Sequence, residues 1–231
     1  MIKQSDLEIY KSERTGLSFY TRVGTSDLKT IKEVVDGNAY QKRYFQILPG
    51  EKWIDLGGNI GAFTVLASSL GANVDVYEPD DVHCELIKMN LELNKLTANV
   101  FNMAVVHDDA EETFLNIGKN GNTWRNSIIK RWGAGRKIVK CINFKKVITK
   151  DICLKMDIDG SEMPILESMI DFPKKMVFEW SFDVDTDIDR YRKNVLNLSN
   201  KYEFVKHAKY KDDIKTWPTS WFPACTNVFC Y

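Results

Sequence analysis

The sequence lacks a net charge, a long apolar run and an ordered cysteine pattern. Its 231 residues include 32 lysines and arginines against 32 aspartates and glutamates, so no overall field draws the chain toward nucleic acid or an anionic membrane. No apolar run approaches the ~20 residues that span a bilayer, and the charged N-terminus lacks the apolar centre of a secretory signal. The five cysteines are odd in number and scattered, unlike a disulfide framework or a zinc cluster. We therefore expect a cytoplasmic protein without a membrane partner.

Positive charge is concentrated locally between Arg125 and Lys140. This stretch holds Arg125, Lys130, Arg131, Arg136, Lys137 and Lys140. A charge run is usually a solvated face, and we interpret this one in that way. Nucleic acid is accordingly not the expected partner, although an RNA substrate stays open as an alternative.

Strand-like and helix-like segments alternate along the chain from residue 51 onward. Short apolar strands are expected at Trp53–Leu56, Val74–Tyr77, Asn99–Val106, Ile152–Ile158 and Met176–Phe182. Segments between them place apolar residues at helical spacing, and this alternation predicts a doubly wound α/β fold, with a parallel sheet covered by helices on both faces. Residues 1–50 are expected to form an extension of strand and helix before a domain of residues 51–231.

Other segments are predicted with less regular patterns. Asp80 and Asp81 precede a helix whose apolar stripe is expected at Val82, Leu86, Met89, Leu93 and Leu96. The middle of the chain is an excursion of short strands or loops at Glu111–Ile117, Ser127–Arg131 and Lys137–Phe144. A last helix at 188–198 leads to two strands, Tyr202–Ala208 and Thr226–Tyr231.

A glycine turn joins the first core strand to its helix. Its pattern, Asp55-x-Gly57-x-Asn59-x-Gly61, departs at Asn59 from the Gly-x-Gly-x-x-Gly of dinucleotide sites. Glycines let the backbone approach a ligand and present free amides. Asp55 would oppose a pyrophosphate, but it suits the ammonium and sulfonium of S-adenosylmethionine (SAM). The turn therefore predicts a SAM site.

Residues at the next strand ends extend this cofactor site. Glu78 follows the second strand, where a carboxylate can accept hydrogen bonds from both ribose hydroxyls. Ala104, flanked by Asn102 and Met103, stands where adenine packs in such folds. The expected cofactor-binding set is Asp55, Gly57, Gly58, Asn59, Gly61, Phe63, Glu78 and Ala104.

Two segments carry a family resemblance. The run Trp53-Ile-Asp-Leu-Gly-Gly-Asn-Ile-Gly-Ala-Phe-Thr64, continued by Tyr77-Glu-Pro79, resembles the SAM-binding motif of FkbM-type methyltransferases. Leu154-Lys-Met-Asp-Ile-Asp-Gly-Ser-Glu162 resembles that family's Lys-x-Asp-x-Glu-Gly-x-Glu segment, with Asp159 in place of the glutamate. The resemblance covers roughly residues 51–180. It implies a Rossmann-like, mostly parallel sheet of about seven strands with an antiparallel last strand, and methyl transfer to an oxygen of a sugar or related small molecule.

The second segment supplies the catalytic candidates. Lys155, Asp157 and Glu162 lie at the end of a central strand, the edge at which open α/β sheets bind ligands. Asp157 is the candidate base for a hydroxyl proton, and Lys155 would lower neighbouring pKa values. Asp157, Asp159 and Glu179 could instead hold Mg²⁺ or Mn²⁺. A structural interpretation also stays open, in which Lys155 and Asp157 form a buried ion pair and Glu162 caps a helix.

Several residues and functions are left as alternatives. His83 and His207 are expected at the surface or half-buried, and His107 is a weak base candidate. Aromatic residues such as Trp124 and Trp132 are expected in core or loop packing, while the Trp217–Pro223 loop could cover an acceptor. The expected function is O-methylation of a small-molecule or glycan acceptor. RNA ribose methylation and a SAM-binding module without turnover are the alternatives.

Overall fold

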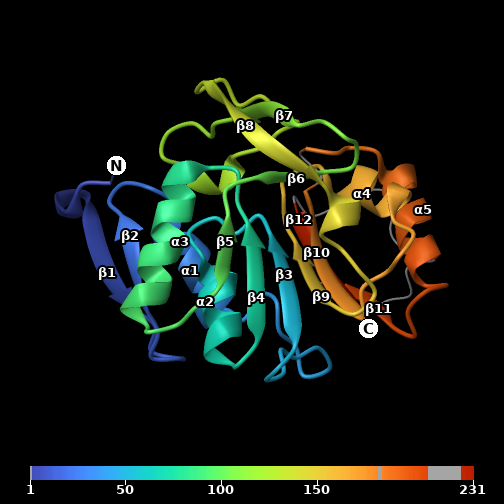
Figure 1. Ribbon diagram of the computed structural model, residues 1–231, viewed down its shortest axis with the longest axis horizontal. Helices are drawn as coiled ribbons and strands as arrows, with labels where there is room; N and C mark the ends of the chain where they lie inside the picture. The colour runs from blue at the N-terminus through green and yellow to red at the C-terminus, as the bar shows by residue number, and fades with distance from the viewer. Residues whose placement is uncertain (1, 182–183, 208–224) are drawn as a thin grey trace.

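A seven-stranded sheet forms the centre of the molecule. The computed structural model describes residues 2–181, 184–207 and 225–231, and Figure 1 shows the arrangement. The strands run in the order β11-β12-β10-β9-β3-β4-β5. Their bounds are β3 Lys52–Leu56, β4 Asn73–Tyr77, β5 Asn99–Phe101, β9 Cys153–Met156, β10 Lys175–Ser181, β11 Val205–His207 and β12 Cys225–Cys230. All neighbours pair in parallel except β12, which is antiparallel to both β10 and β11. The predicted fold class is confirmed.

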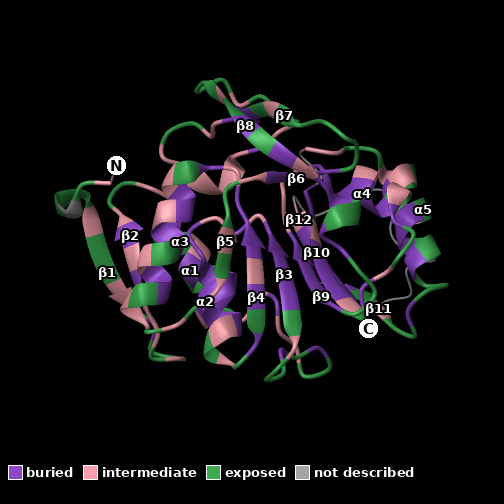
Figure 2. Cartoon of the chain, in the orientation of Figure 1, coloured by how far each residue is buried: buried purple, intermediate pink, exposed green. Residues whose placement is uncertain are grey.

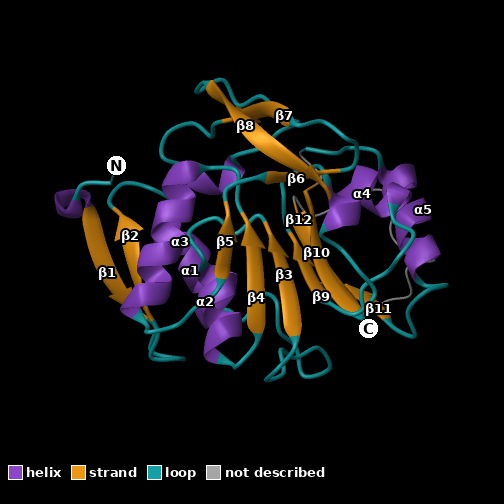
Figure 3. Cartoon of the chain, viewed as in Figure 1, coloured by secondary structure: helices purple, strands orange, loops and turns teal. Residues whose placement is uncertain are grey.

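Helices cover both faces of this sheet. In Figure 3, α1 (Asp27–Ile31), α2 (Ala62–Ser69) and α3 (Asp81–Leu93) lie on one side of β3, and α4 (Glu162–Ser168) and α5 (Ile188–Leu198) lie on the other. Alternate strand residues enter two separate hydrophobic clusters, because successive side chains point to opposite faces. Ile54 and Leu56 pack with α4 and α5, whereas Trp53 packs with α1, α2 and α3. The central strands are buried and β1 is largely exposed (Figure 2).

The first fifty residues pack onto the sheet domain. They form the hairpin β1 (Leu7–Lys11) and β2 (Ser18–Arg22), then α1 and one π-helical turn, Lys32–Asp36. Phe19, Val35 and Phe45 are buried in the same hydrophobic cluster as Trp53. The extension therefore shares its core with the domain that follows it.

The middle excursion builds a second, three-stranded sheet. Its order is β6-β8-β7, with β6 Ala104–Val106, β7 Glu112–Asn116 and β8 Arg136–Asn143. Figure 1 shows this sheet above the arrowheads of β3 and β4, at the carboxyl edge of the main sheet. The single strand expected at Asn99–Val106 is wrong, because Asn102 turns the chain and donates to the Glu78 and Pro79 carbonyls (3.0 and 2.9 Å). Ser127–Arg131 forms only an isolated bridge, from Ser127 to Asn116.

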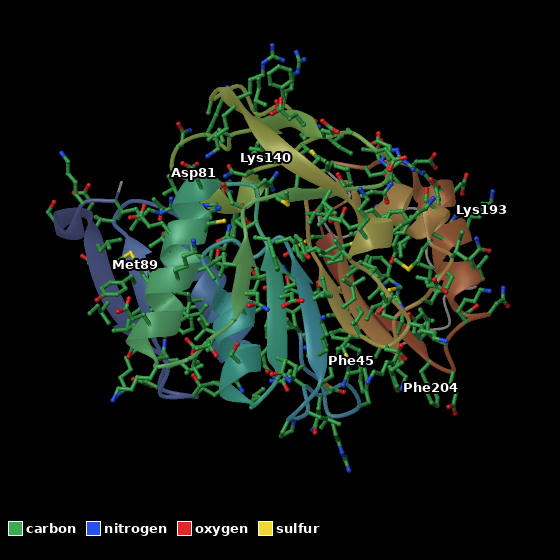
Figure 4. All side chains as sticks on the ribbon, in the orientation of Figure 1. Phe45, Asp81, Met89, Lys140, Lys193 and Phe204 are labelled. Atoms are coloured by element: carbon green, nitrogen blue, oxygen red, sulfur yellow. The ribbon has the colours of Figure 1, made fainter. Side chains whose placement is uncertain are left out.

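Contacts with α3 hold the small sheet in place. Asp80 caps α3, and its carboxylate accepts from the Val82 amide at 2.9 Å. Lys137 of β8 forms ion pairs with Asp80 (3.2 Å) and with Asp81. In Figure 4, Lys140 of β8 is labelled to the right of Asp81, which marks the start of α3. Within the described ranges, no helix is long and apolar enough to cross a membrane.

Candidate active site

A cavity of about 420 Å³ opens at the carboxyl edge of the main sheet, within the ~300–1,000 Å³ range of ligand pockets. One half lies over β3, β4 and the start of β6, lined by Gly57, Asn59, Glu78, Met103 and Ala104. The other half lies over β9, β10 and β12, lined by Asp157, Asp159, Ser161, Glu179, Ser181 and Cys225. After the roles expected from the sequence, we call these the cofactor half and the acceptor half. Of the residues predicted from the sequence, the first half holds Gly57, Asn59, Glu78 and Ala104, and the second holds Asp157, Asp159 and Glu179.

Glu78 is the buried carboxylate of the cofactor half. It is 4% exposed, and its oxygens accept hydrogen bonds from the Asn59 amide (2.8 Å) and the Asp80 amide (2.9 Å). The His83 ring lies 3.5 Å from one of them. A carboxylate has about four lone-pair sites, so two remain for hydroxyl groups of a ligand.

The glycines of the turn are required by close packing. Gly57 lines the cavity and has φ +79°, and a Cβ there would lie 1.8 Å from the Asp157 carbonyl oxygen. A Cβ at Gly58 would lie 2.3 Å from Val76, and one at Gly61 would lie 3.3 Å from Ile87. Gly58 and Gly61 are not on the cavity wall. These two glycines therefore shape the turn against β4 and α3.

Asp55 and Lys155 lie beneath the turn as a buried pair. Their charged atoms are 3.1 Å apart, and Thr64 donates to the other Asp55 oxygen at 2.6 Å. The Lys155 ammonium also donates to the Leu56 and Gly57 carbonyls, at 3.2 and 2.7 Å. Burial disfavours this ammonium, but Asp55 and Asp157 outweigh burial and raise the pKa of Lys155. Neither residue is on the cavity wall. Asp55 would therefore affect cofactor binding, and Lys155 catalysis, only by holding the turn in place.

Phe63 is also removed from the cavity wall. Its ring packs edge-to-face against Trp53 (5.3 Å) and Tyr40 (5.6 Å), with only 2% of the residue exposed. Phe63 therefore supports the site by positioning Tyr40.

Asp157 is the carboxylate at the junction of the two halves. Its side chain is 28% exposed, and the Tyr40 hydroxyl donates to it at 2.6 Å. The Lys155 ammonium lies 4.0 Å from the same oxygen. Burial and the Asp157 charge raise the pKa of Tyr40 well above its ordinary value, so Tyr40 remains a donor. Sequence reasoning missed Tyr40, which lies 117 positions away in a segment without a motif.

The loop after β9 is closed by Glu162. Its carboxylate accepts from the Ile158 amide (2.7 Å) and the Gly160 amide (2.8 Å). Burial raises the pKa of Glu162 to about 7, against the opposing effect of these amides. Glu162 is buried and does not line the cavity. This position favours a structural role for Glu162 over a catalytic one.

A family model decides the identity of the chain. The model of the methyltransferase FkbM domain matches residues 55–205, which include the turn, Glu78 and Asp157. The chain belongs to the FkbM methyltransferase family. It is accordingly a SAM-dependent methyltransferase.

Solved structures resemble this FkbM chain more distantly, and no curated protein matches it. TYW2 of M. jannaschii in complex with AdoMet is 14% identical with TM-score 0.49, over 99% of this chain and 86% of that one. A SAM-dependent O-methyltransferase of Thermotoga maritima is 12% identical with TM-score 0.48, over 96% and 76%. The tRNA (uracil-54, C5)-methyltransferase of Pyrococcus abyssi is 11% identical with TM-score 0.48, over 97% and 44%. None of these likenesses bears on the acceptor.

The cofactor half of the FkbM chain fits SAM. Glu78 is a buried carboxylate that would accept hydrogen bonds from a ribose, and Met103 and Ala104 form a wall against which adenine would pack. Gly57 also lines this half, and its missing side chain leaves room for the Asp157 carbonyl. Glu78, Asn59, Met103 and Ala104 are therefore the residues that would hold SAM.

A metal site finds no support in the geometry. Asp157, Asp159 and Glu179 all line the acceptor half, but across residues 2–181, 184–207 and 225–231 no three His, Cys, Asp or Glu side chains are grouped to hold a metal ion.

The excursion forms a wall of the cavity that the sequence did not predict. Thr123, Trp124, Arg125 and Asn126 line it. The Asn59 side chain donates to the Thr123 carbonyl at 3.2 Å, and Asn126 donates to the Asp80 carboxylate at 3.1 Å. Trp124, for which core or loop packing was expected, lies under the Lys29 ammonium (3.9 Å from the ring centre) and also lines the cavity.

The histidines are placed differently from expectation. His83 and His207 are buried, at 2% and 6% exposure, because one packs against Glu78 and the other accepts or donates a hydrogen bond with Tyr191 (3.1 Å). The expectation of surface or half-buried positions was wrong. His107 is exposed beside Asp108 and away from the cavity wall. The Trp217–Pro223 loop lies outside the described residues.

Proposed function

We propose that this FkbM methyltransferase methylates a hydroxyl group of a sugar, glycan or related small molecule, with Asp157 as the general base. The observation that carries the proposal is the position of Asp157. Its partly exposed carboxylate stands between the cofactor half and the acceptor half, and it is held by Tyr40.

The residues of the chain divide the chemistry between them. Bound SAM supplies an electrophilic methyl group. Asp157 would accept the proton of the acceptor hydroxyl as the new carbon–oxygen bond forms, since an alcohol is a weak nucleophile until that proton leaves. Tyr40 donates to one Asp157 oxygen and leaves the other for the acceptor. Lys155 does not line the cavity, and its contacts with the turn and with Asp157 hold the two in position relative to each other.

The basic stretch gives little support to an RNA acceptor. Lys137 is paired with Asp80 and Asp81, Arg136 packs over the Phe114 ring (4.0 Å) and Arg125 over Trp132 (4.8 Å). These cations are engaged within the chain. An RNA acceptor would show itself by steep loss of activity as salt rises, because binding then releases counterions.

The decisive experiment measures transfer of labelled methyl from SAM to a panel of sugars, glycans, phenols and RNA. With the accepted substrate, Asp157→Asn should reduce kcat by about 100–10,000-fold and leave SAM affinity unchanged, and Tyr40→Phe should lower kcat less. Asp171→Asn, at an exposed position outside the cavity, is the matched control. Near-normal turnover by Asp157→Asn would remove the base role, and loss of activity with a chelator, restored by Mg²⁺ or Mn²⁺, would move the chemistry to a metal.

A further inference from the structure

The acceptor half of the cavity is rich in carboxylates from separate parts of the chain. Glu33 follows α1, Asp157 and Asp159 follow β9, and Glu179 lies in β10. Two basic residues share the wall, Lys29 and Arg125, and each packs over a tryptophan ring of the excursion. Acidic side chains therefore predominate on the side of the cavity formed by β9 and β10.

Ser161 gives an independent sign of a ligand at the same place. It is 3% exposed and lines the cavity, yet its hydroxyl has no hydrogen-bond partner among the residues that the structure describes. Ser161 precedes α4, and its hydroxyl makes no capping hydrogen bond to that helix. An unpaired buried hydroxyl costs free energy, so its position indicates that a bound molecule supplies the partner.

We propose that the acceptor carries an ammonium group next to the hydroxyl that is methylated, as in an amino sugar, and that Asp159, Glu179 and Ser161 bind this ammonium. The inference rests on the proposed function, and it specifies the class of acceptor. A primary ammonium has three N–H donors, and these residues offer it two carboxylates and one hydroxyl. The neighbouring hydroxyl is then directed toward Asp157.

An organic cation fits this place better than a metal ion or the charge of the cofactor. The described acidic side chains are not grouped closely enough to hold a metal. The strand order places β10 on the opposite side of β3 from β4, so Glu179 lies away from Glu78 and the cofactor half.

Electrostatics within the cluster supports the same inference. Burial first, and then Asp157, Glu162 and Glu179, raise the pKa of Asp159 well above its ordinary value, with Arg125 opposing. Burial first, and then Asp157, Glu33 and Glu162, raise the pKa of Glu179, with Cys225 opposing. Ser181 also donates to Glu179 at 3.3 Å. A bound ammonium would relieve this mutual repulsion.

The test compares three sugars that differ only at one group. Methyl α-D-glucosaminide, its N-acetyl derivative and methyl α-D-glucoside are titrated by calorimetry into the full chain saturated with S-adenosylhomocysteine. We expect the glucosaminide to bind about tenfold tighter or more, the scale of hydrogen bonds between charged groups. Equal affinities, or no binding of any of the three at millimolar concentration, overturn the inference.

Variants test which residues cause the preference for the glucosaminide. Asp159→Asn combined with Glu179→Gln should abolish it, and Ser161→Ala, which removes a single oxygen, should weaken glucosaminide binding severalfold with the neutral sugars unaffected. The combined Asp171→Asn and Glu203→Gln variant changes the same charges at exposed positions and should retain the preference. Unchanged preference in both site variants overturns the inference. Circular dichroism and S-adenosylhomocysteine affinity report on folding, and Ser161→Ala remains informative if the double variant does not fold.

Methyl transfer separates this inference from the proposed function. Equally efficient O-methylation of the neutral glucoside would leave the proposed function in place and overturn the ammonium site. Preferential binding of the glucosaminide without O-methylation of any sugar in the panel would support the ammonium site and count against the proposed function. Methylation of the amine itself would overturn the inference, because the nitrogen would then be the nucleophile.

Discussion

At the scale of single residues, Glu78 connects the turn to the cavity. Its two oxygens each accept one backbone amide, from Asn59 and from Asp80, so the same carboxylate that faces the cofactor half also holds the glycine turn and the start of α3. Asp55 shows the contrasting case. It is fully buried and paired with Lys155, so its charge is used inside the protein.

Because two backbone amides donate to Glu78, its replacement by glutamine has a predictable effect. Glu78→Gln replaces one acceptor oxygen by an NH₂ group, which would face a backbone N–H. We expect SAM affinity to fall by about 1.5–3 kcal/mol, roughly 10–100-fold, the range for hydrogen bonds to a charged group. Calorimetric titration with SAM measures this loss.

Glu92→Gln, at an exposed position of α3, serves as the control for Glu78→Gln. Equal SAM affinity in the two variants would exclude Glu78 from the ribose contact.

At the scale of elements, the site depends on how tightly β3 and β9 end against each other. Gly57 follows β3, and the Asp157 amide donates to the Leu56 carbonyl at 3.1 Å. The Asp157 carbonyl then occupies the space that a side chain at residue 57 would need. The glycine therefore allows the end of β9 to approach the turn, which places Asp157 beside the cofactor half.

This contact predicts different costs for two glycines with the same backbone conformation. Gly50 has φ +80° and open space around it, whereas Gly57 has φ +79° and the Asp157 carbonyl at 1.8 Å from a built Cβ. Gly50→Ala should lower the free energy of unfolding by about 1–2 kcal/mol, the cost of a left-handed backbone. Gly57→Ala should lower it by about 1–3 kcal/mol more, because the two backbones must separate.

Urea unfolding of both variants measures the difference, and SAM titration shows whether the cofactor site is lost with it. Equal losses of stability would mean that Gly57 is chosen for its backbone conformation alone.

At the scale of the whole molecule, the N-terminal extension and the excursion meet over the carboxyl edge of the main sheet. The Thr123 hydroxyl donates to Asp27 at 2.8 Å, and the Ser26 hydroxyl accepts from the Thr123 amide at 2.9 Å. Asp27 is itself buried and paired with Arg22 at 2.8 Å. Two segments outside the parallel sheet thus close the cavity together.

The acidic groups around the cavity predict that stability depends on pH. Burial raises the pKa of Glu162 from its ordinary 4.5 to about 7, so the folded state holds a proton that the unfolded state releases. Its contribution is fully present below pH 4.5 and is lost as pH rises through 7. The pKa values of Asp159 and Glu179 are raised in the same direction. The loss for Glu162 alone amounts to about 3 kcal/mol.

Urea unfolding at pH 4.5 and pH 7.5 tests this prediction with wild type and Glu162→Gln. The variant should be less stable at low pH, because its NH₂ group faces one backbone amide, and its stability should change less between the two pH values. Equal changes in both proteins would contradict the assignment to Glu162.

Much of the sheet could be predicted from local sequence. Short apolar runs separated by glycine and acidic residues indicate β3, β4, β9 and β10, because a strand buried on both faces needs apolar side chains throughout. The helix after Asp80 was also predicted, but its buried face was not. Of the expected stripe, only Leu86 is buried. The buried face also contains Ile87, Asn90 and Leu91, because β2 as well as the main sheet packs against this helix.

The sequence by itself determined which residues stand at the strand ends, and therefore that Asn59, Glu78, Ala104 and Asp157 would come together. Parallel strands all end at one edge of the sheet, so position in the strand is enough to place them. Only the tertiary structure decided which charges enter the cavity. Asp55 lies in β3 and Asp157 directly follows the neighbouring strand β9, yet the first is paired with Lys155 under the turn and the second is held at the opening by Tyr40. Contacts between residues so distant in the chain depend on packing of whole segments, and no local pattern encodes them.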